Sequence, residues 1–92
     1  MNLFTLLQKR AAAGRPVRVG LVGAGKFGSM FLSQVPHIPG LDVAAIADLS
    51  PERARQACRR VGWRDERIAQ TRFTDDALAM IAGDDLEVMI EA

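Results

Sequence analysis

Three closely spaced glycines near the start of the chain have the spacing needed to bind phosphate groups through the backbone. They lie in the hexapeptide Gly23-Ala24-Gly25-Lys26-Phe27-Gly28. In this spacing the first glycine allows a tight turn, the second lets the backbone approach a pyrophosphate, and the third lets a helix pack closely on a sheet. Free N–H groups at the start of that helix then attract the anion. Such a pattern also occurs by chance, so the segments around it decide its meaning.

An aspartate downstream strengthens this interpretation. Asp48 lies about 20 residues after Gly28 and directly follows an apolar run, residues 41–47. A carboxylate at the end of a second strand can accept hydrogen bonds from the adenosine ribose of a dinucleotide. We include the following residues of the loop and first helical turn in the candidate site: Leu49, Ser50 and Arg53. The alternative is a glycine turn in another doubly wound domain, with Asp48 as an ordinary residue at a strand end.

The choice between NAD and NADP stays open at the level of sequence. Asp48 favours NAD, because the 2′-phosphate of NADP would meet a carboxylate. Arg53 is close enough in sequence to pair with that phosphate, although it also fits a solvated helix face.

The segments around the glycines alternate between strand and helix patterns. Residues 17–22 form a short apolar run, as expected of a strand buried on both faces. A helix over residues 26–35 follows, and residues 41–47 form the second strand. Ser50 and Pro51 are typical of the start of a helix. One face of that helix has apolar residues at helical spacing: Ala54, Ala57, Cys58 and Val61.

The remaining elements complete the pattern. We expect a helix over residues 3–12 capped by Asn2, and a third strand within 68–73. A further helix is capped by Thr74, and its inward-pointing residues are Leu78, Ile81 and Ala82. The last strand spans residues 87–92. One helix followed by βαβαβαβ predicts a parallel sheet with helices on both faces. The expected fold class is therefore α/β, the first half of a Rossmann-type sheet with strand order 3-2-1-4, preceded by a short helix.

Composition excludes several other classes. The chain has 92 residues, 49% of them hydrophobic and 25% charged, and a net charge of +1, so nothing favours nucleic acid or a membrane surface as a partner. One cysteine, Cys58, and one histidine, His37, allow neither an intrachain disulfide nor a metal cluster built from these residue types. We expect Cys58 in the core, His37 in a loop, no catalytic or metal-binding residue within these 92, and a cytoplasmic location.

The stretch over residues 17–48, followed by LSPERA, resembles the N-terminal domain of homoserine dehydrogenase-like oxidoreductases: VRVGLVGAGKFGSMFLSQVPHIPGLDVAAIAD. The opening of the chain, with a helix before the first strand, is more specifically similar to members of the branch that has a C-terminal SAF domain. That branch includes reductoisomerase-like enzymes of isoprenoid precursor synthesis. The resemblance implies that residues 1–92 are the N-terminal part of an NAD(P)-binding domain, with catalytic and SAF domains beyond them. The reductoisomerase-like members use NADPH. Four residues fall on the family's cofactor motif: Gly23, Gly25, Gly28 and Asp48.

We therefore expect the nucleotide-binding part of an oxidoreductase that transfers a hydride between nicotinamide and a small carbonyl or hydroxy substrate. The 92 residues alone are expected to be inactive. Two alternatives remain: a non-enzymatic dinucleotide sensor or regulatory module, and the same fold binding S-adenosylmethionine. The last strand has apolar residues and no covering helix after it, so we also expect it to pair with another copy or a second chain, as in a homo-oligomer.

Overall fold

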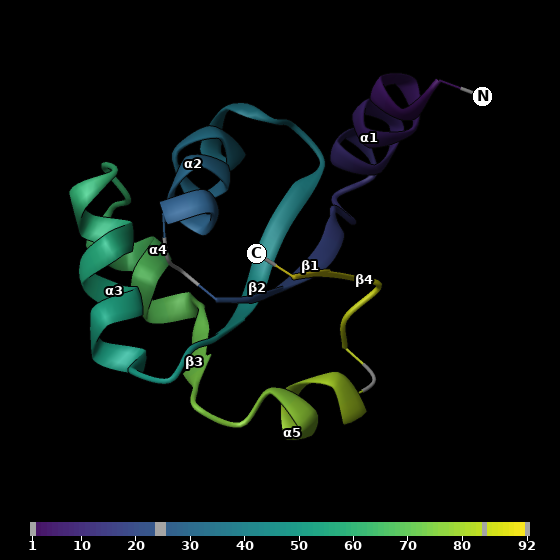
Figure 1. The fold of residues 1–92 in the computed structure, drawn as a ribbon. Helices are drawn as coiled ribbons and strands as arrows, with labels where there is room; N and C mark the ends of the chain where they lie inside the picture. The colour runs from purple at the N-terminus through teal and green to yellow at the C-terminus, as the bar shows by residue number, and fades with distance from the viewer. Residues whose placement is uncertain (1, 24–25, 84, 92) are drawn as a thin grey trace.

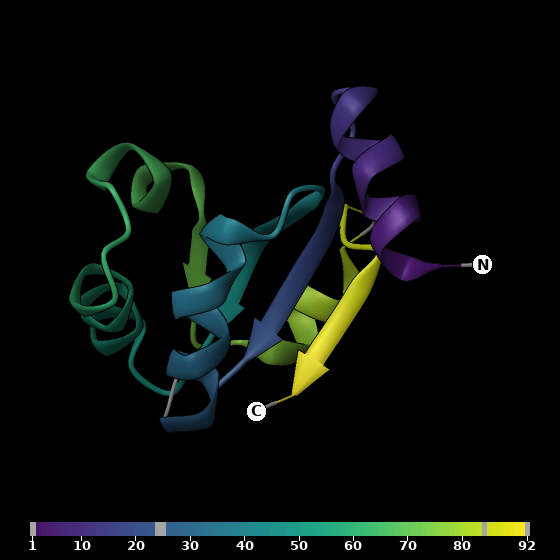
Figure 2. The ribbon, with the colours of Figure 1, turned by 90° about the horizontal axis from the view of Figure 1, so that it is seen from above.

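The fold is built on a parallel sheet of four strands. The computed structural model describes residues 2–23, 26–83 and 85–91. The sheet contains β1 (Val17–Val22), β2 (Leu41–Ala47), β3 (Arg72–Thr74) and β4 (Val88–Glu91), in the order β3-β2-β1-β4. All strands run in the same direction (Figure 2). The predicted parallel sheet, its strand order and the helix before its first strand are thus confirmed.

Helices cover both faces of the sheet. They are α1 (Leu3–Ala12), α2 (Lys26–Gln34), the short 3₁₀ helix η1 (Val35–His37), α3 (Pro51–Arg60), α4 (Asp65–Gln70) and α5 (Ala77–Ala82). Figure 1 shows α2, α3 and α4 together on one side of the sheet and α5 on the other. None of the helices in the described ranges is long and apolar enough to cross a membrane.

The main core lies between the sheet and the layer of α2, α3 and α4. Leu21 of β1 and Ile46 of β2 have no exposed surface, and they pack with Leu32 of α2 and Cys58 of α3. Burial of each large aliphatic side chain stabilises the fold by about 1.5–3 kcal/mol. These contacts fix the distance between the sheet and α2, the helix that follows the glycine loop.

A bulge in β2 determines which of its side chains enter this core. Val43 pairs with Val19, but the next pair is Ala45 with Gly20, so Ala44 is an additional residue on β2. An additional residue shifts the alternation of side chains by one position. Val43 therefore faces the same core as Ile46, three residues later.

Trp63 joins the segments of this layer. Its side chain is only 6% exposed, and its indole N–H donates a hydrogen bond to the Leu32 carbonyl over 2.8 Å. The Arg67 guanidinium lies 5.7 Å from the indole ring centre, at a cation–π distance. The segment between α3 and α4 is thereby anchored to the last turn of α2.

The third strand differs from the prediction in its position. Residues 65–70 form α4, and the strand spans Arg72–Thr74, so it overlaps only the end of the predicted range 68–73 and extends one residue past it. Two acidic residues in the first turn of α4, Asp65 and Glu66, favour a helix there because they lie at the positive end of its dipole. Ile68 is buried in the main core from this helix.

Helix α5 also differs from the prediction. Its N-cap is Asp76, whose carboxylate accepts a hydrogen bond from the Ala79 N–H over 2.9 Å, whereas Thr74 is the last residue of β3. Leu78 and Ile81, expected to point inward, are 79% and 51% exposed. Met80 instead packs on the sheet and is 2% exposed. A helix of six residues has fewer than two turns, so its apolar spacing does not identify the buried face.

Helix α1 packs against the start of β1 and also contacts the segment just before β4, the strand that pairs with β1. Leu7 is buried with Val17 and Val19, and Asn2 caps the helix as predicted. Arg10 forms an ion pair of 2.7 Å with Glu87, just before β4. The hydrogen bond from Arg10 lowers the pKa of the Glu87 carboxyl.

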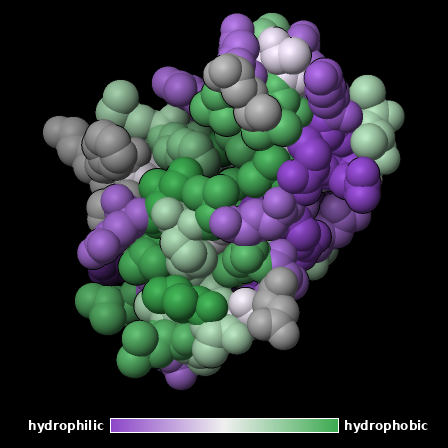
Figure 3. All heavy atoms as spheres, turned by 90° about the vertical axis from the view of Figure 1, so that its right-hand side faces the viewer, coloured by the Kyte–Doolittle hydropathy of each residue, from purple (hydrophilic) through white to green (hydrophobic). Residues whose placement is uncertain are grey.

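The side of the molecule that includes α1, β4 and α5 has many apolar side chains at its surface (Figure 3). The exposed large apolar residues of these three elements are Leu3, Phe4, Leu78, Ile81, Val88 and Met89. An exposed apolar surface of this kind is a frequent property of interaction sites.

Candidate functional site

The candidate site lies at the edge of the sheet where the parallel strands end. Ligands of open parallel sheets bind outside the carboxyl ends of the strands. A cavity of about 270 Å³ occupies this position, lined by Val22, Gly23, Ala47, Asp48, Leu49, Asp75 and Ala77. The lining comes from the ends of β1 and β2, the loop after β2, and the turn between β3 and α5.

Gly23 turns the chain away from β1 at this cavity. Its φ is +89°, a left-handed conformation that glycine adopts without steric cost. Its N–H donates a hydrogen bond of 2.7 Å to the carbonyl of Ala47 at the end of β2. The first glycine of the motif therefore makes the tight turn that its position in the sequence predicts.

Asp48 is held at the cavity by its backbone and by its side chain. Its N–H donates to the Thr74 carbonyl over 2.9 Å, which fixes the end of β2 to the end of β3. Its carboxylate accepts a hydrogen bond of 2.9 Å from the Ser50 N–H. Ser50 also caps α3, since its hydroxyl accepts from the Arg53 N–H over 3.3 Å, as predicted.

The structure brings together part of the predicted set. Gly23, Asp48 and Leu49 line the same cavity, and the Leu49 side chain is 97% exposed. Arg53 is exposed on the first turn of α3 and does not belong to the lining. The other members belong to the glycine loop and to α2. Lys26 and Phe27 are the first residues of α2, and Gly28 is buried within that helix. Ala24 and Gly25 lie outside the described residues.

Asp75 also lines the cavity, although it is not among the site residues predicted from the sequence. It follows Thr74 directly, so it occupies at β3 the position that Asp48 occupies at β2. The signal that identifies it is an acidic residue immediately after a strand. Asp75 can be assigned to the site in this way only when the end of β3 is known to be Thr74.

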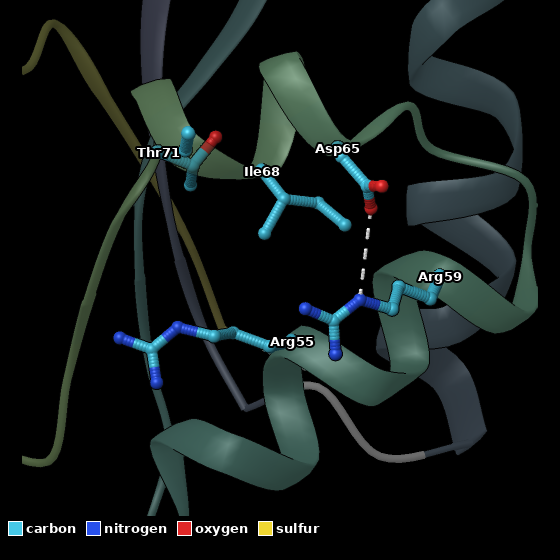
Figure 4. Close-up of a pocket in the computed structure, with 6 residues that line it drawn as sticks. Arg55, Arg59, Asp65, Ile68 and Thr71 are labelled. Atoms are coloured by element: carbon cyan, nitrogen blue, oxygen red, sulfur yellow. Dashed lines mark ion pairs between the residues drawn. The ribbon is translucent and has the colours of Figure 1, made fainter.

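A second and larger pocket lies between α3 and α4, on another part of the surface (Figure 4). Its volume is about 440 Å³, and Arg55 and Arg59 contribute to its lining. Arg59 pairs with Asp65 over 3.8 Å, and Arg55 pairs with Glu52 over 3.2 Å. Neighbouring carboxylates pair with both guanidinium groups, so each positive charge among the described residues that line this pocket has a negative partner.

Cys58 is a core residue, as predicted, and burial raises the pKa of its thiol to about 11. At pH 8 a thiol with the ordinary pKa of 9.0 would be ionised about 100 times more often. We expect iodoacetamide at pH 8 to alkylate Cys58 in the folded chain at least about 100 times more slowly than in urea. Mass spectrometry over time measures both rates. Equal rates would contradict the buried position of the thiol.

Comparisons with known proteins bear on the identity of this chain. It is 36% identical to inositol 2-dehydrogenase from Acidothermus cellulolyticus over 82 residues, which are 88% of this chain and 22% of that protein. It is 44% identical to glycosyl hydrolase family 109 protein 4 from Phocaeicola vulgatus over 45 residues, 49% of this chain and 8% of that protein. The chain thus spans less than a quarter of the length of these relatives.

A solved structure supports the fold. GenD2 from gentamicin A biosynthesis, determined in complex with NAD, superposes with a TM-score of 0.62 at 19% identity, covering 84% of this chain and 20% of that one. None of these three proteins is named as a homoserine dehydrogenase, so the resemblance to that branch and to its SAF domain stays a prediction. Residues 17–90 match an oxidoreductase family with an NAD-binding Rossmann fold, and the chain therefore belongs to this family, GFO/IDH/MocA.

Proposed function

We propose that this chain is the cofactor-binding part of a larger NAD-dependent dehydrogenase, and that the cavity beside Asp48 receives the adenosine half of the dinucleotide. The main support for the proposal is that Gly23 and Asp48 line the same cavity at the carboxyl ends of the strands. The family match over residues 17–90 supports it independently.

Each residue of the site has a role in this proposal. The glycine loop, residues 23–28, and the N-terminus of α2 bind the pyrophosphate through backbone N–H groups. Asp48 accepts hydrogen bonds from the ribose hydroxyls. The exposed side chain of Leu49 offers an apolar surface to the adenine ring. Ser50 orients the Asp48 carboxylate, since its N–H donates to it.

We infer that the cofactor is NAD rather than NADP. Asp48 lies on the cavity, whereas Arg53, the residue proposed to pair with a 2′-phosphate, is outside its lining. The resemblance to the reductoisomerase-like branch favours NADPH instead, and titration with both cofactors distinguishes the two.

In the whole enzyme, bound nicotinamide would accept a hydride from a carbon bearing a hydroxyl group, or donate one to a carbonyl carbon. The residues of this chain hold the adenosine and pyrophosphate, which places the nicotinamide relative to a substrate site formed by further domains. The relative named inositol 2-dehydrogenase supports a polyhydroxylated substrate. We place the catalytic residues beyond residue 92, together with the domains that bind substrate.

Titration of the chain with NADH, NADPH and S-adenosylmethionine, measured by calorimetry, tests this function. We expect NADH to bind most tightly, because the cavity offers a carboxylate to the ribose and no basic side chain among its described lining residues. Tight binding of S-adenosylmethionine alone would overturn the proposal.

Activity of the whole protein separates the enzyme from its alternatives. A dehydrogenase reduces NAD⁺ when given inositol or another polyol, followed by absorbance at 340 nm. A dinucleotide sensor binds NADH and shows no turnover. The match to a glycosyl hydrolase favours one more candidate, which would release nitrophenol from aryl glycosides. The homo-oligomer and the cytoplasmic location stay predictions, and the apolar surface of α1, β4 and α5 supports the first of these.

A further inference from the structure

We propose that Asp75 is a second determinant of cofactor choice, acting together with Asp48 to exclude the 2′-phosphate of NADP. This inference rests on the proposed function, since it assigns a role within the same cavity. Both aspartates line that cavity, from the ends of two adjacent strands.

Backbone contacts hold the two aspartates on one rim. The Asp48 N–H donates to the carbonyl of Thr74, the residue directly before Asp75. On the other side of Asp75, the Asp76 N–H donates a 3.0 Å hydrogen bond to the Thr74 hydroxyl. The Asp76 carboxylate in turn accepts from the Ala79 N–H at the start of α5. The position of Asp75 is therefore fixed relative to Asp48 by residues on both sides of it.

The charge around the cavity has one sign. Among the described residues that line it, the charged ones are Asp48 and Asp75, and the others are apolar or glycine. Arg72 of β3, the basic residue nearest to Asp75 in sequence, pairs with Asp85 over 3.7 Å and lines a different pocket. Arg53 is also outside the lining. A 2′-phosphate entering this cavity would meet two carboxylates, whereas a 2′-hydroxyl can donate a hydrogen bond to either.

This arrangement differs from discrimination by a single carboxylate in one measurable respect. If Asp48 acted alone, neutralising it would remove the preference for NAD. With two carboxylates at the site, removal of either charge leaves the other to repel the phosphate. The preference for NAD should therefore fall in two steps.

Calorimetric titration of the full chain with NADH and with NADPH tests the inference. The measured quantity is the ratio of the two dissociation constants, Kd for NADPH divided by Kd for NADH. We expect Asp75→Asn to lower this ratio about fivefold, Asp48→Asn to lower it at least as much, and the double variant to lower it further than either. Glu66→Gln, which removes a charge from the exposed face of α4, is the matched control and should leave the ratio unchanged.

Salt provides a second readout that needs no substitution. Repulsion between exposed charges weakens as ionic strength rises, so the wild-type ratio should fall between about 0.05 and 0.5 M NaCl. The double variant should show a smaller change. Thermal unfolding of each variant shows whether the substitution has altered the fold.

The possible failures are distinguishable. An unchanged ratio in Asp75→Asn, together with a lowered ratio in Asp48→Asn, would overturn the role of Asp75 and leave the proposed function standing. Absence of NADH binding to the wild-type chain would overturn the proposed function and this inference with it.

Discussion

Replacing Gly40 with alanine is expected to lower the free energy of unfolding by about 3 kcal/mol, from two causes that act together. Gly40 has a φ of +87°, which an L-residue with a side chain adopts only with strain. A Cβ at this position would also overlap the backbone of Leu7, whose carbonyl carbon lies 2.7 Å from it. The backbone of α1 cannot yield as a flexible side chain would, so α1 must move off the sheet.

Gly62→Ala is the matched control. Gly62 has a comparable φ of +96°, but a Cβ there would meet nothing within 4 Å, so only the backbone strain remains, about 1 kcal/mol. Urea unfolding followed by the fluorescence of Trp63, the single tryptophan, measures both variants. Equal losses for the two would contradict close packing of α1 on Gly40.

Trp63→Ala is expected to cost about 3–5 kcal/mol, the range for a large aromatic side chain removed from a core. The indole is 6% exposed and packs between the sheet and the helices of the main core. Its loss would leave a cavity there and an unpaired carbonyl at Leu32. This loss is a large part of the roughly 5–15 kcal/mol by which folded domains are stabilised, so a much lower urea midpoint is expected for the variant.

Trp63→Phe separates the two contributions. Phenylalanine fills most of the volume and removes the N–H donor, so we expect a smaller loss of about 1–2 kcal/mol. Far-ultraviolet circular dichroism measures both variants, because each lacks the fluorescent side chain. A loss in Trp63→Phe as large as that in Trp63→Ala would mean that the hydrogen bond, rather than the buried volume, stabilises this region.

The sequence was sufficient for the elements whose signals are local. Strands β1 and β2 are apolar runs bounded by glycine, proline or aspartate, and their limits match the prediction. Helix α3 has its cap at Ser50 and a buried stripe that includes Ala54 and Cys58, so its start and its buried face were both correct. The alternation of helices and strands predicted the parallel sheet, and the Rossmann-type glycine loop predicted its observed order.

The remaining elements depend on contacts distant in sequence. Helix α4 has one buried apolar residue, Ile68, so no periodicity distinguishes it from a strand. Strand β3 contains three residues and is fixed by pairing with β2, for example Phe73 with Ile46. The partner of the Trp63 indole is 31 residues away, at Leu32. Such pairings follow from the assembled fold and have no local signal.

Residues of the candidate site could be predicted from the sequence where the ends of the strands before them were predicted correctly. Gly23 and Asp48 follow β1 and β2, whose ends were correctly placed, and both lie on the cavity. Asp75 follows β3, whose end was not, and its position at the same edge was missed. The limits of a strand therefore decide which side chains can be assigned to a site of this kind.

The place of β1 in the sheet has a consequence for the order of events during synthesis. β1 pairs with β2, which follows after α2 and the short η1. It also pairs with β4, and just before β4 the Glu87 carboxylate accepts a hydrogen bond from the N–H of Arg18, 69 residues away. During synthesis on the ribosome, β1 and β2 can therefore pair well before β4 has been made. Until β4 emerges, one edge of the central strand has free backbone groups and can pair with another chain. A slow or interrupted translation between β2 and β4 would lengthen this interval and increase the need for a chaperone.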